Sequence, residues 1–350
     1  MKSAVELMLE LENDLINLLI KFIADGNMER ADWQLKKLEA FGLFKDSASS
    51  ISKKRIPEIL SAAKKEIASI AKQKASLVDK YTPDDKLADA VPIDASPAIK
   101  AAISKYETSV KKYFTSAAGN MLSSVDSMYT QTVDKVLSMR STHAITGREA
   151  ISQIASEWAD NGLSSFRDKA GRQWSTEAYA QMLVRTQSTQ AAFDAQSARL
   201  DDLDCDLVEI SSHMGARPKC EPYQGKIYSR NGKTKGYPLL SSTSMGEIDG
   251  LFGINCGHNM FPYFPGTEKT YSSYGKKENE NAYKNSQQQR YLERTIRSAK
   301  KDVEYQNRIN ANESAKNAAK DKLARAENSM STFINNTGRT RREGREEIYN

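Results

Sequence analysis

A single apolar stripe of unusual length, from Ala98 to Arg140, sets the strongest limit on how this chain can fold. Its members recur at the spacing of an amphipathic helix; they are Tyr106, Val110, Tyr113, Ala117, Met121, Val125, Met128, Thr132 and Val136. The pattern predicts one helix of about 40 residues, roughly 60 Å long. Because so long a helix needs packing partners along its length, we interpret the stripe as packing surface rather than as a cofactor site.

Helical periodicity also fills the first 80 residues. The apolar residues that recur near a 3.6 period are Val5, Leu7, Leu11, Leu15, Leu18, Leu19 and Phe22. The sequence ADGN interrupts this pattern, and two later segments resume it, with Pro57 at the expected start of a helix. Prolines 83, 92 and 97 then occur without periodicity, which predicts a linker over residues 81–98.

The middle of the chain changes from helix to strand. Ser175 is the expected N-cap of a helix that continues to about residue 200. The segment CDLVEISSHMG follows and predicts a strand. Five of the nine prolines (218, 222, 238, 262 and 265) fall in the next stretch, together with short β-like runs. We therefore predict a small, turn-rich β module.

These patterns predict an α+β fold, mostly long helices with a small turn-rich β module inserted near residues 205–268. The expected regions are an N-terminal helical region (1–80), a Pro-containing linker (81–98), a long-helix region (99–204), the β module (205–268) and a basic, polar helical tail (269–350). The tail has only a thin apolar stripe, so we expect its helices to need an external partner.

Charge, hydropathy and cysteine content narrow the classes of protein. The longest apolar run near the start, Leu15–Ile23, is interrupted by Asn17 and Lys21 and is too short to cross a membrane. No secretory signal is recognised at the start, so we expect a cytoplasmic protein. The net charge of +6 equals the excess of 17 Lys and Arg over 11 Asp and Glu from Lys276 onward. A basic tail of this kind can bind DNA or an acidic protein surface. Its charges are mixed, however, and a solvated helical face is the more usual explanation of such a pattern.

Two histidines and two cysteines gather in the predicted β module. His213, Cys220, Cys256 and His258 are the ligand types of tetrahedral zinc, and a closed site would stabilise a module with little core. Two other interpretations stay open. The cysteines could be buried packing residues, with the histidines bonded to turn carbonyls. A cysteine could also be a nucleophile with a histidine as its base, although no orienting Asp or Asn is identified.

Two arginines stand beside small or kinked elements: Arg185 in LVRTQ and Arg217 in GARPK. A guanidinium group can bind carboxylates or carbonyls in a fixed fork. We expect both arginines to tie a helix to the β module rather than to bind phosphate. Three cysteines leave one unpaired in any disulfide scheme, so we expect reduced thiols.

Three segments together resemble the phage minor capsid protein 2 family: LVRTQSTQAAFDAQ, VEISSHMGARPKCEPYQGKIYS and YPLLSSTSMGEIDGLFGINCGHNMFPYFPG. The layout Arg217-Pro218, Gly225-Lys226 and Asn255-Cys256 is also similar to the head morphogenesis proteins of Mu-type phages. The resemblance is specific over residues 180–266. In that pattern a histidine is usual where Cys220 stands and an arginine where Gly257 stands. We expect structural or interaction roles for Arg185, Arg217, Pro218, Gly225 and Asn255.

The resemblance implies a minor structural protein of a tailed-phage head, present in the virion near the portal. It implies the portal protein and other capsid proteins as partners, a part in capsid assembly, and leaves open delivery with the DNA. Such a protein would be in the host cytoplasm during assembly. The alternative function is a thiol-dependent hydrolase or toxin-like effector carried in the particle and using Cys220 or Cys256.

Overall fold

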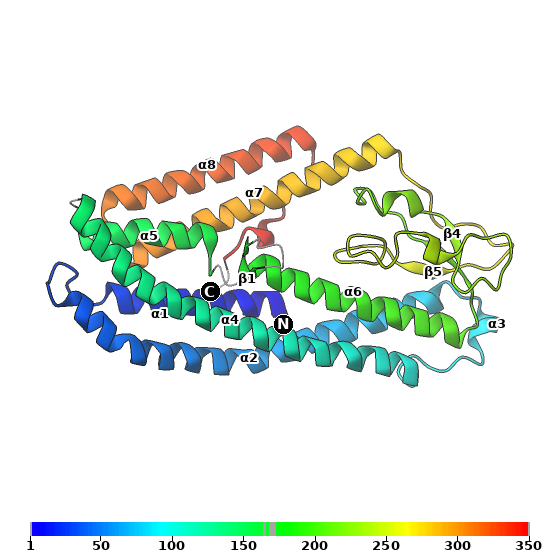
Figure 1. Cartoon of the computed structure of the whole chain (residues 1–350). Helices are drawn as coiled ribbons and strands as arrows, with labels where there is room; N and C mark the ends of the chain where they lie inside the picture. The colour runs from blue at the N-terminus through cyan, green and yellow to red at the C-terminus, as the bar shows by residue number, and fades with distance from the viewer. Residues whose placement is uncertain (1, 144, 164–165, 168–172, 349–350) are drawn as a thin grey trace. The chain divides into compact units, whose positions relative to one another are not determined.

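The computed structural model describes residues 2–143, 145–163, 166–167 and 173–348, and it confirms the mostly helical α+β class (Figure 1). The helices are α1 (Ala4–Ala24), α2 (Trp33–Lys80), α3 (Asp84–Leu87), α4 (Pro97–His143), α5 (Gly147–Asn161), α6 (Thr176–Asp202), α7 (Lys276–Arg308) and α8 (Glu313–Thr337). The strands are β1 (Phe166–Arg167), β2 (Gln173–Trp174), β3 (Leu207–Ile210), β4 (Ile227–Ser229) and β5 (Met260–Pro262). Three short 3-10 helices are η1 (Glu221–Tyr223), η2 (Leu240–Ser242) and η3 (Glu343–Arg345).

The chain forms two compact units, each assembled from stretches that are distant in sequence. Unit 1 consists of Met1–Ile59, Phe114–Ala180 and Gln287–Asn350, and unit 2 consists of Leu60–Tyr113 and Gln181–Ser286. Helices α2 and α4 therefore each contribute one part to each unit. The stripe that predicts a long helix from Ala98 is confirmed by α4, which is continuous from Pro97 to His143.

Unit 1 is held by apolar helix faces. Helix α1 begins at a capping box, in which the Ser3 hydroxyl accepts a hydrogen bond from the Glu6 amide at 3.2 Å and Glu6 accepts one from the Ser3 amide at 2.7 Å. In the core of the unit the rings of Phe44 and Tyr129 lie 4.6 Å apart. The buried Tyr129 hydroxyl donates to the carbonyl of Lys37 at 2.8 Å, so its polar end is satisfied.

Helix α8 and the part of α7 from Gln287 onward belong to unit 1, and the expectation that the C-terminal helices need an external partner is wrong. Helices α7 and α8 bury a shared apolar cluster, whose members are Leu292, Ile296, Ala299, Ala326 and Met330. Lys301 of α7 also forms an ion pair with Glu12 of α1 at 3.1 Å. The thin stripe was sufficient because small and buried polar side chains share the contact with the rest of the unit.

The expectation that Pro57 begins a helix is also wrong, because Pro57 lies inside α2. Proline in a helix interior removes one backbone hydrogen bond and crowds the preceding turn. The helix nevertheless continues, since Ser52 precedes the proline and Ile59 follows it, and both are buried. Packing on either side offsets the local cost.

Unit 2 contains a three-stranded antiparallel sheet in the order β4-β3-β5, as the strand predictions for this region require. The central strand β3 is buried at all four positions, and its Val208 pairs with Tyr228 on one side and Pro262 on the other. Gln196 of α6 donates to the carbonyl of Met260 at 3.1 Å, which holds the helix against β5. The Ser175 N-cap of α6 is confirmed by its bond from the Ala178 amide.

The predicted linker is bound to unit 2 at two points. The Ser96 hydroxyl donates to the carboxylate of Asp202 at 3.1 Å. Arg199, which is buried, donates to the carbonyl of Val91 and forms an ion pair with Asp79. Residues 81–98 are therefore anchored on α2 and α6 rather than forming a free tether.

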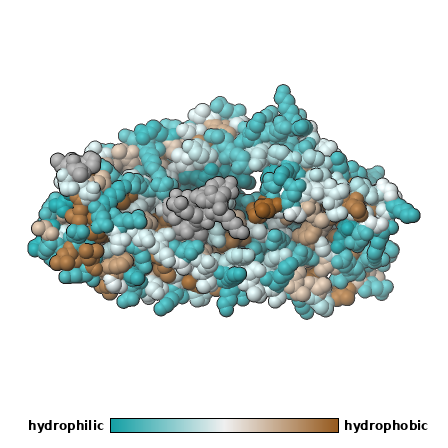
Figure 2. All heavy atoms as spheres, in the orientation of Figure 1, coloured by the Kyte–Doolittle hydropathy of each residue, from teal (hydrophilic) through white to brown (hydrophobic). Residues whose placement is uncertain are grey.

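A helix that spans a membrane needs a minimum length and a largely apolar composition. Among the residues that the structure describes, none of the helices combines the length and the apolar character needed to cross a bilayer. The face drawn in Figure 2 is largely hydrophilic, with hydrophobic residues scattered over it.

Candidate metal centre in the turn-rich module

Tight turns place the two cysteines of the module. Pro218 occupies the second position of a turn closed by the bond from the Cys220 amide to the Arg217 carbonyl at 2.9 Å, a position that suits the fixed φ of proline. A second turn, from Gly253 to Cys256, is closed by a bond of 3.0 Å. Asn255 in that turn has a positive φ of 59°, which asparagine adopts more readily than most residues.

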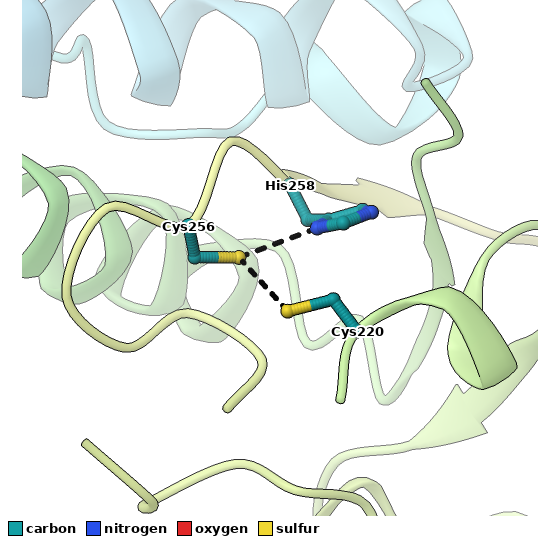
Figure 3. A group of neighbouring side chains, drawn as sticks. All are labelled: Cys220, Cys256 and His258. Atoms are coloured by element: carbon teal, nitrogen blue, oxygen red, sulfur yellow. Dashed lines mark hydrogen bonds between the residues drawn. The ribbon is translucent and has the colours of Figure 1, made fainter. Parts of the chain in front are cut away.

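Cys220, Cys256 and His258 meet in the core of the module (Figure 3). The Sγ atoms of Cys220 and Cys256 lie 4.0 Å apart, and Cys256 Sγ lies 3.3 Å from Nδ1 of His258. Cys256 and His258 point the same way because alternate residues of an extended segment share a side. The exposed fractions of the three residues are only 1%, 8% and 5%.

His213 lies beside this group but is not one of its three members. Its ring lies against that of His258, tilted by 32° with the centroids 4.4 Å apart. Its Nε2 atom is buried and has no hydrogen-bond partner among the described residues. The structure thus brings three of the four predicted ligands together and places the fourth in contact with one of them.

The protonation of the group follows from shared hydrogen bonds. The hydrogen bond from Cys220 lowers the pKa of Cys256 to about 4. Burial opposes this change, and the neighbouring His258 contributes to it. The same bond, together with burial, raises the pKa of Cys220 above its ordinary range. Burial and the nearby His258 lower the pKa of His213, which favours its neutral ring. One thiolate and a neutral imidazole are forms that bind metal.

Polar side chains surround the three residues. Nε2 of His258 lies 3.2 Å from Oε1 of Gln224, an acceptor. When Nε2 carries the only ring proton and donates it to this oxygen, Nδ1 directs its lone pair toward Cys256, which is the form that a metal would bind. Gln224 also accepts from the amide of His213 at 2.7 Å. Arg217 donates to the carbonyls of Ile254 at 2.7 Å and Gly250 at 3.2 Å. These bonds lie within the module and join the Cys220 turn to the Cys256 loop, so the expectation that Arg217 ties a helix to the module is wrong.

Two more predicted residues border the centre. Arg185 of α6 lines a cavity of about 230 Å³ whose wall also includes Cys256, His258 and Lys74. Gly225 has a positive φ of 63°, and a Cβ atom there would lie 2.9 Å from the carbonyl oxygen of Tyr271. Only glycine fits this position without displacing backbone.

Sequence reasoning missed the polar residues that hold the loops. The carboxylate of Glu209 accepts from the amides of Thr270 and Tyr271, and Asn279 of α7 bonds three backbone groups of Gly215 and Ala216. These residues lie in polar or alternating stretches where nothing in the sequence marks them. Gln224 stands directly before Gly225, and a glycine at a tight turn was the available signal for its neighbour.

Comparison with known proteins gives the class and then the family. The chain is 28% identical over 308 residues to a protein of Lactococcus phage LL-H described as a structural protein, a match that covers 82% of this chain and 81% of that protein. A family model described as phage minor capsid protein 2 matches residues 1–335. The chain therefore belongs to the phage minor capsid protein 2 family. No solved structure matches the chain.

Family membership confirms the resemblance and extends it far beyond residues 180–266. The chain is a structural protein of the phage particle and not an enzyme, with other capsid components as its partners. The contact between Cys256 and His258 is the pair that a thiol hydrolase would use. The comparisons give that alternative no support, because the family and the relative are both structural.

Proposed function

We propose that this minor capsid protein binds the portal vertex of the phage head and assists capsid assembly. The observation that carries the proposal is the match to the minor capsid family over residues 1–335. Such a protein meets its partners in the host cytoplasm during assembly and becomes part of the head near the portal. Delivery with the DNA stays a prediction of the resemblance.

The start of α2 is the surface that we assign to the portal contact. Leu35, Leu38 and Leu43 lie within three turns of this helix, with 60%, 48% and 65% of their surfaces exposed. Apolar side chains at this density on a helix end suit a protein partner, since burying them removes apolar surface from water. All three leucines belong to unit 1.

Contact with DNA through residues 269–350 has weaker support. Several basic side chains of this segment bind carboxylates within unit 1; the pairs are Arg297–Glu177, Lys301–Glu12, Lys322–Asp160, Arg341–Glu346 and Arg342–Glu293. Charges that are already paired add little to the attraction for phosphates. The sequence-based prediction of a DNA-binding tail therefore stays a prediction, and a protein contact is the function we propose.

The test is incorporation into particles assembled from the capsid proteins of the same phage, with and without its portal protein. We expect incorporation to require the portal and to fall at least about tenfold when Leu35, Leu38 and Leu43 are all changed to Gln, because central apolar residues dominate protein interfaces. Ile248→Gln is the matched control, since Ile248 is 76% exposed on the β module. Equal incorporation into particles that lack the portal would contradict the proposal.

A further inference from the structure

We propose that Cys220, Cys256, His258 and His213 bind one zinc ion, which fixes the turn-rich module. Cys220 comes from one turn, Cys256 and His258 come from a second segment of the module, and the donor atoms of these three residues lie within 4.8 Å of one another. All three are buried in the described structure. This inference concerns the order of the module and is independent of the portal contact assigned to α2.

The spacing of the donor atoms matches the edges of a zinc tetrahedron. With Zn–S near 2.3 Å and Zn–N near 2.0 Å, two sulfur ligands lie about 3.7 Å apart and a sulfur and a nitrogen about 3.5 Å apart. The observed edges are 4.0 Å between Cys220 and Cys256 and 3.3 Å between Cys256 and His258. These two edges differ from the expected values by a few tenths of an ångström, and the donor atoms of the third pair, Cys220 and His258, lie within 4.8 Å of each other.

The residues behind the ligands are arranged as metal sites require. A histidine ligand commonly donates its second ring N–H to an oxygen, which fixes its orientation. His258 does this through Nε2 to Gln224, and Nδ1 faces Cys256. The Arg217 guanidinium lies 3.9 Å from Cys220 Sγ and adds positive charge beside a site with two thiolates.

We assign His213 as the fourth ligand because its ring lies beside His258 and its Nε2 atom has no hydrogen-bond partner among the described residues. Its Nε2 is buried and unpaired, which is costly unless something binds it. A Cβ atom at Gly257 would lie 3.3 Å from this nitrogen, so His213 packs on the backbone between the ligands Cys256 and His258. Glycine at 257 keeps that approach open. His213 would have to rotate to bring Nε2 to the ion held by the other three residues.

Zinc fits this set better than other common ions. Two thiolates and two imidazoles in a closed tetrahedron are typical of structural zinc, whereas magnesium and calcium prefer oxygen ligands. The ion would join the segment after β3, the turn before η1 and the segment before β5. One ion would add a cross-link between these three segments to the apolar cluster that already contains Cys220 and Cys256.

The first experiment measures metal in the full-length chain purified under reducing conditions. We expect one zinc per chain, lost on incubation with a strong chelator and restored by added zinc. Replacing zinc with cobalt(II) should give sulfur-to-cobalt charge-transfer bands and the intense visible bands of a tetrahedral site. Substoichiometric zinc in the reduced protein, or a Cys220–Cys256 disulfide in place of the metal, would overturn the proposal.

Variants of the ligands provide the second experiment. Cys220→Ser and Cys256→Ser should each weaken zinc binding at least about 100-fold in a chelator competition, since each removes a direct ligand. Cys205→Ser is the matched control: Cys205 is also buried, its thiol donates to the Leu207 carbonyl at 3.3 Å, and it should bind zinc normally. Cys220→His should restore binding because imidazole is also a zinc ligand. Unchanged zinc content in Cys256→Ser would refute the site.

The fourth ligand is tested by His213→Asn in the cobalt-loaded protein. We expect the visible bands to shift as a water molecule replaces the imidazole. Zinc affinity should fall by at least about 10–100-fold, which is the loss that follows when a residue supporting a metal ligand is changed. Gly257→Ala should weaken binding in the same direction, because the added methyl group crowds Nε2. A spectrum identical to wild type in both variants would show that His213 is not a ligand.

Discussion

Unit 1 and the β module of unit 2 are held together in different ways. In unit 1, long helix faces meet around large apolar side chains such as Tyr129 and Phe44, and no single contact defines the arrangement. In residues 205–268, three short strands leave most of the chain in turns. There, single polar side chains such as Arg217 and Glu209 each bind two backbone groups of distant loops. The first region is held by packing between helix faces, whereas in the second a small apolar core is supplemented by a few polar side chains that hold the turns.

The largest effect is expected in the core of unit 1. Tyr129→Ala removes a fully buried aromatic ring, which should lower the free energy of unfolding by about 3–5 kcal/mol. Tyr129→Phe removes only the hydroxyl that bonds Lys37, for a loss of about 1 kcal/mol. Urea titration followed by circular dichroism measures both. Tyr113→Ala on the same helix is the control, because Tyr113 is 40% exposed; an equal loss there would contradict the account.

A smaller but more localised effect is expected in the module. Arg217→Met leaves the carbonyls of Ile254 and Gly250 without their donor, which should cost about 1–3 kcal/mol. Hydrogen exchange should accelerate in residues 245–258 and stay unchanged in α1. Lys219→Met is the neighbouring control, since Lys219 is exposed and binds only the side chains of Glu247 and Asp249. If both variants behaved alike, the anchoring role of Arg217 would be wrong.

Acid should weaken the module through Asp206. Burial raises the pKa of this carboxyl, but hydrogen bonds from Asn231, Ser229 and Thr234 outweigh it and lower the pKa to about 2. A depressed folded-state pKa means that its stabilisation is complete above the unfolded value of about 3.9 and is lost as pH falls toward 2. The stability advantage of wild type over Asp206→Asn should therefore narrow between pH 4 and pH 2 in urea titrations. A pH-independent difference would contradict this prediction.

The smallest effect is expected at the surface of unit 1. Lys135 and Glu157 form an exposed ion pair at 2.6 Å between α4 and α5. A double-mutant cycle with alanine should give a coupling of less than about 1 kcal/mol, because water and salt screen such pairs. A coupling well above this value would mean that unit 1, like the module, depends on particular polar contacts.

The same contrast explains what the sequence could predict. The 3.6-residue stripe gave α4 almost to the residue, and the Ser175 cap and the β3 strand followed from local signals. Pro57 was misjudged because local propensity ignores packing on both sides of a proline. The C-terminal helices were misjudged because their partner, unit 1, is built from residues far away in sequence.

The candidate centre was predictable in residue type but not in geometry. Cys220, Cys256 and His258 stand out because thiols and imidazoles are rare in this chain, and the structure brings them together. The roles of Gln224 and Asn279 depend on turns that close across many residues, and such contacts leave no periodic trace in a single sequence. Residue chemistry can thus nominate a site, whereas its supporting contacts come only from the fold.

Hydrogen exchange on the full-length chain tests most directly whether the Cys220, Cys256 and His258 centre keeps the β module ordered. The comparison is between wild type and the double variant Cys220→Ser/Cys256→Ser, read peptide by peptide. We predict that amides of β3, β4 and β5 lose protection in the variant, while those of α1, α5 and α8 exchange as in wild type. Unchanged protection of the three strands, or an equal loss across the helices of unit 1, would contradict the account.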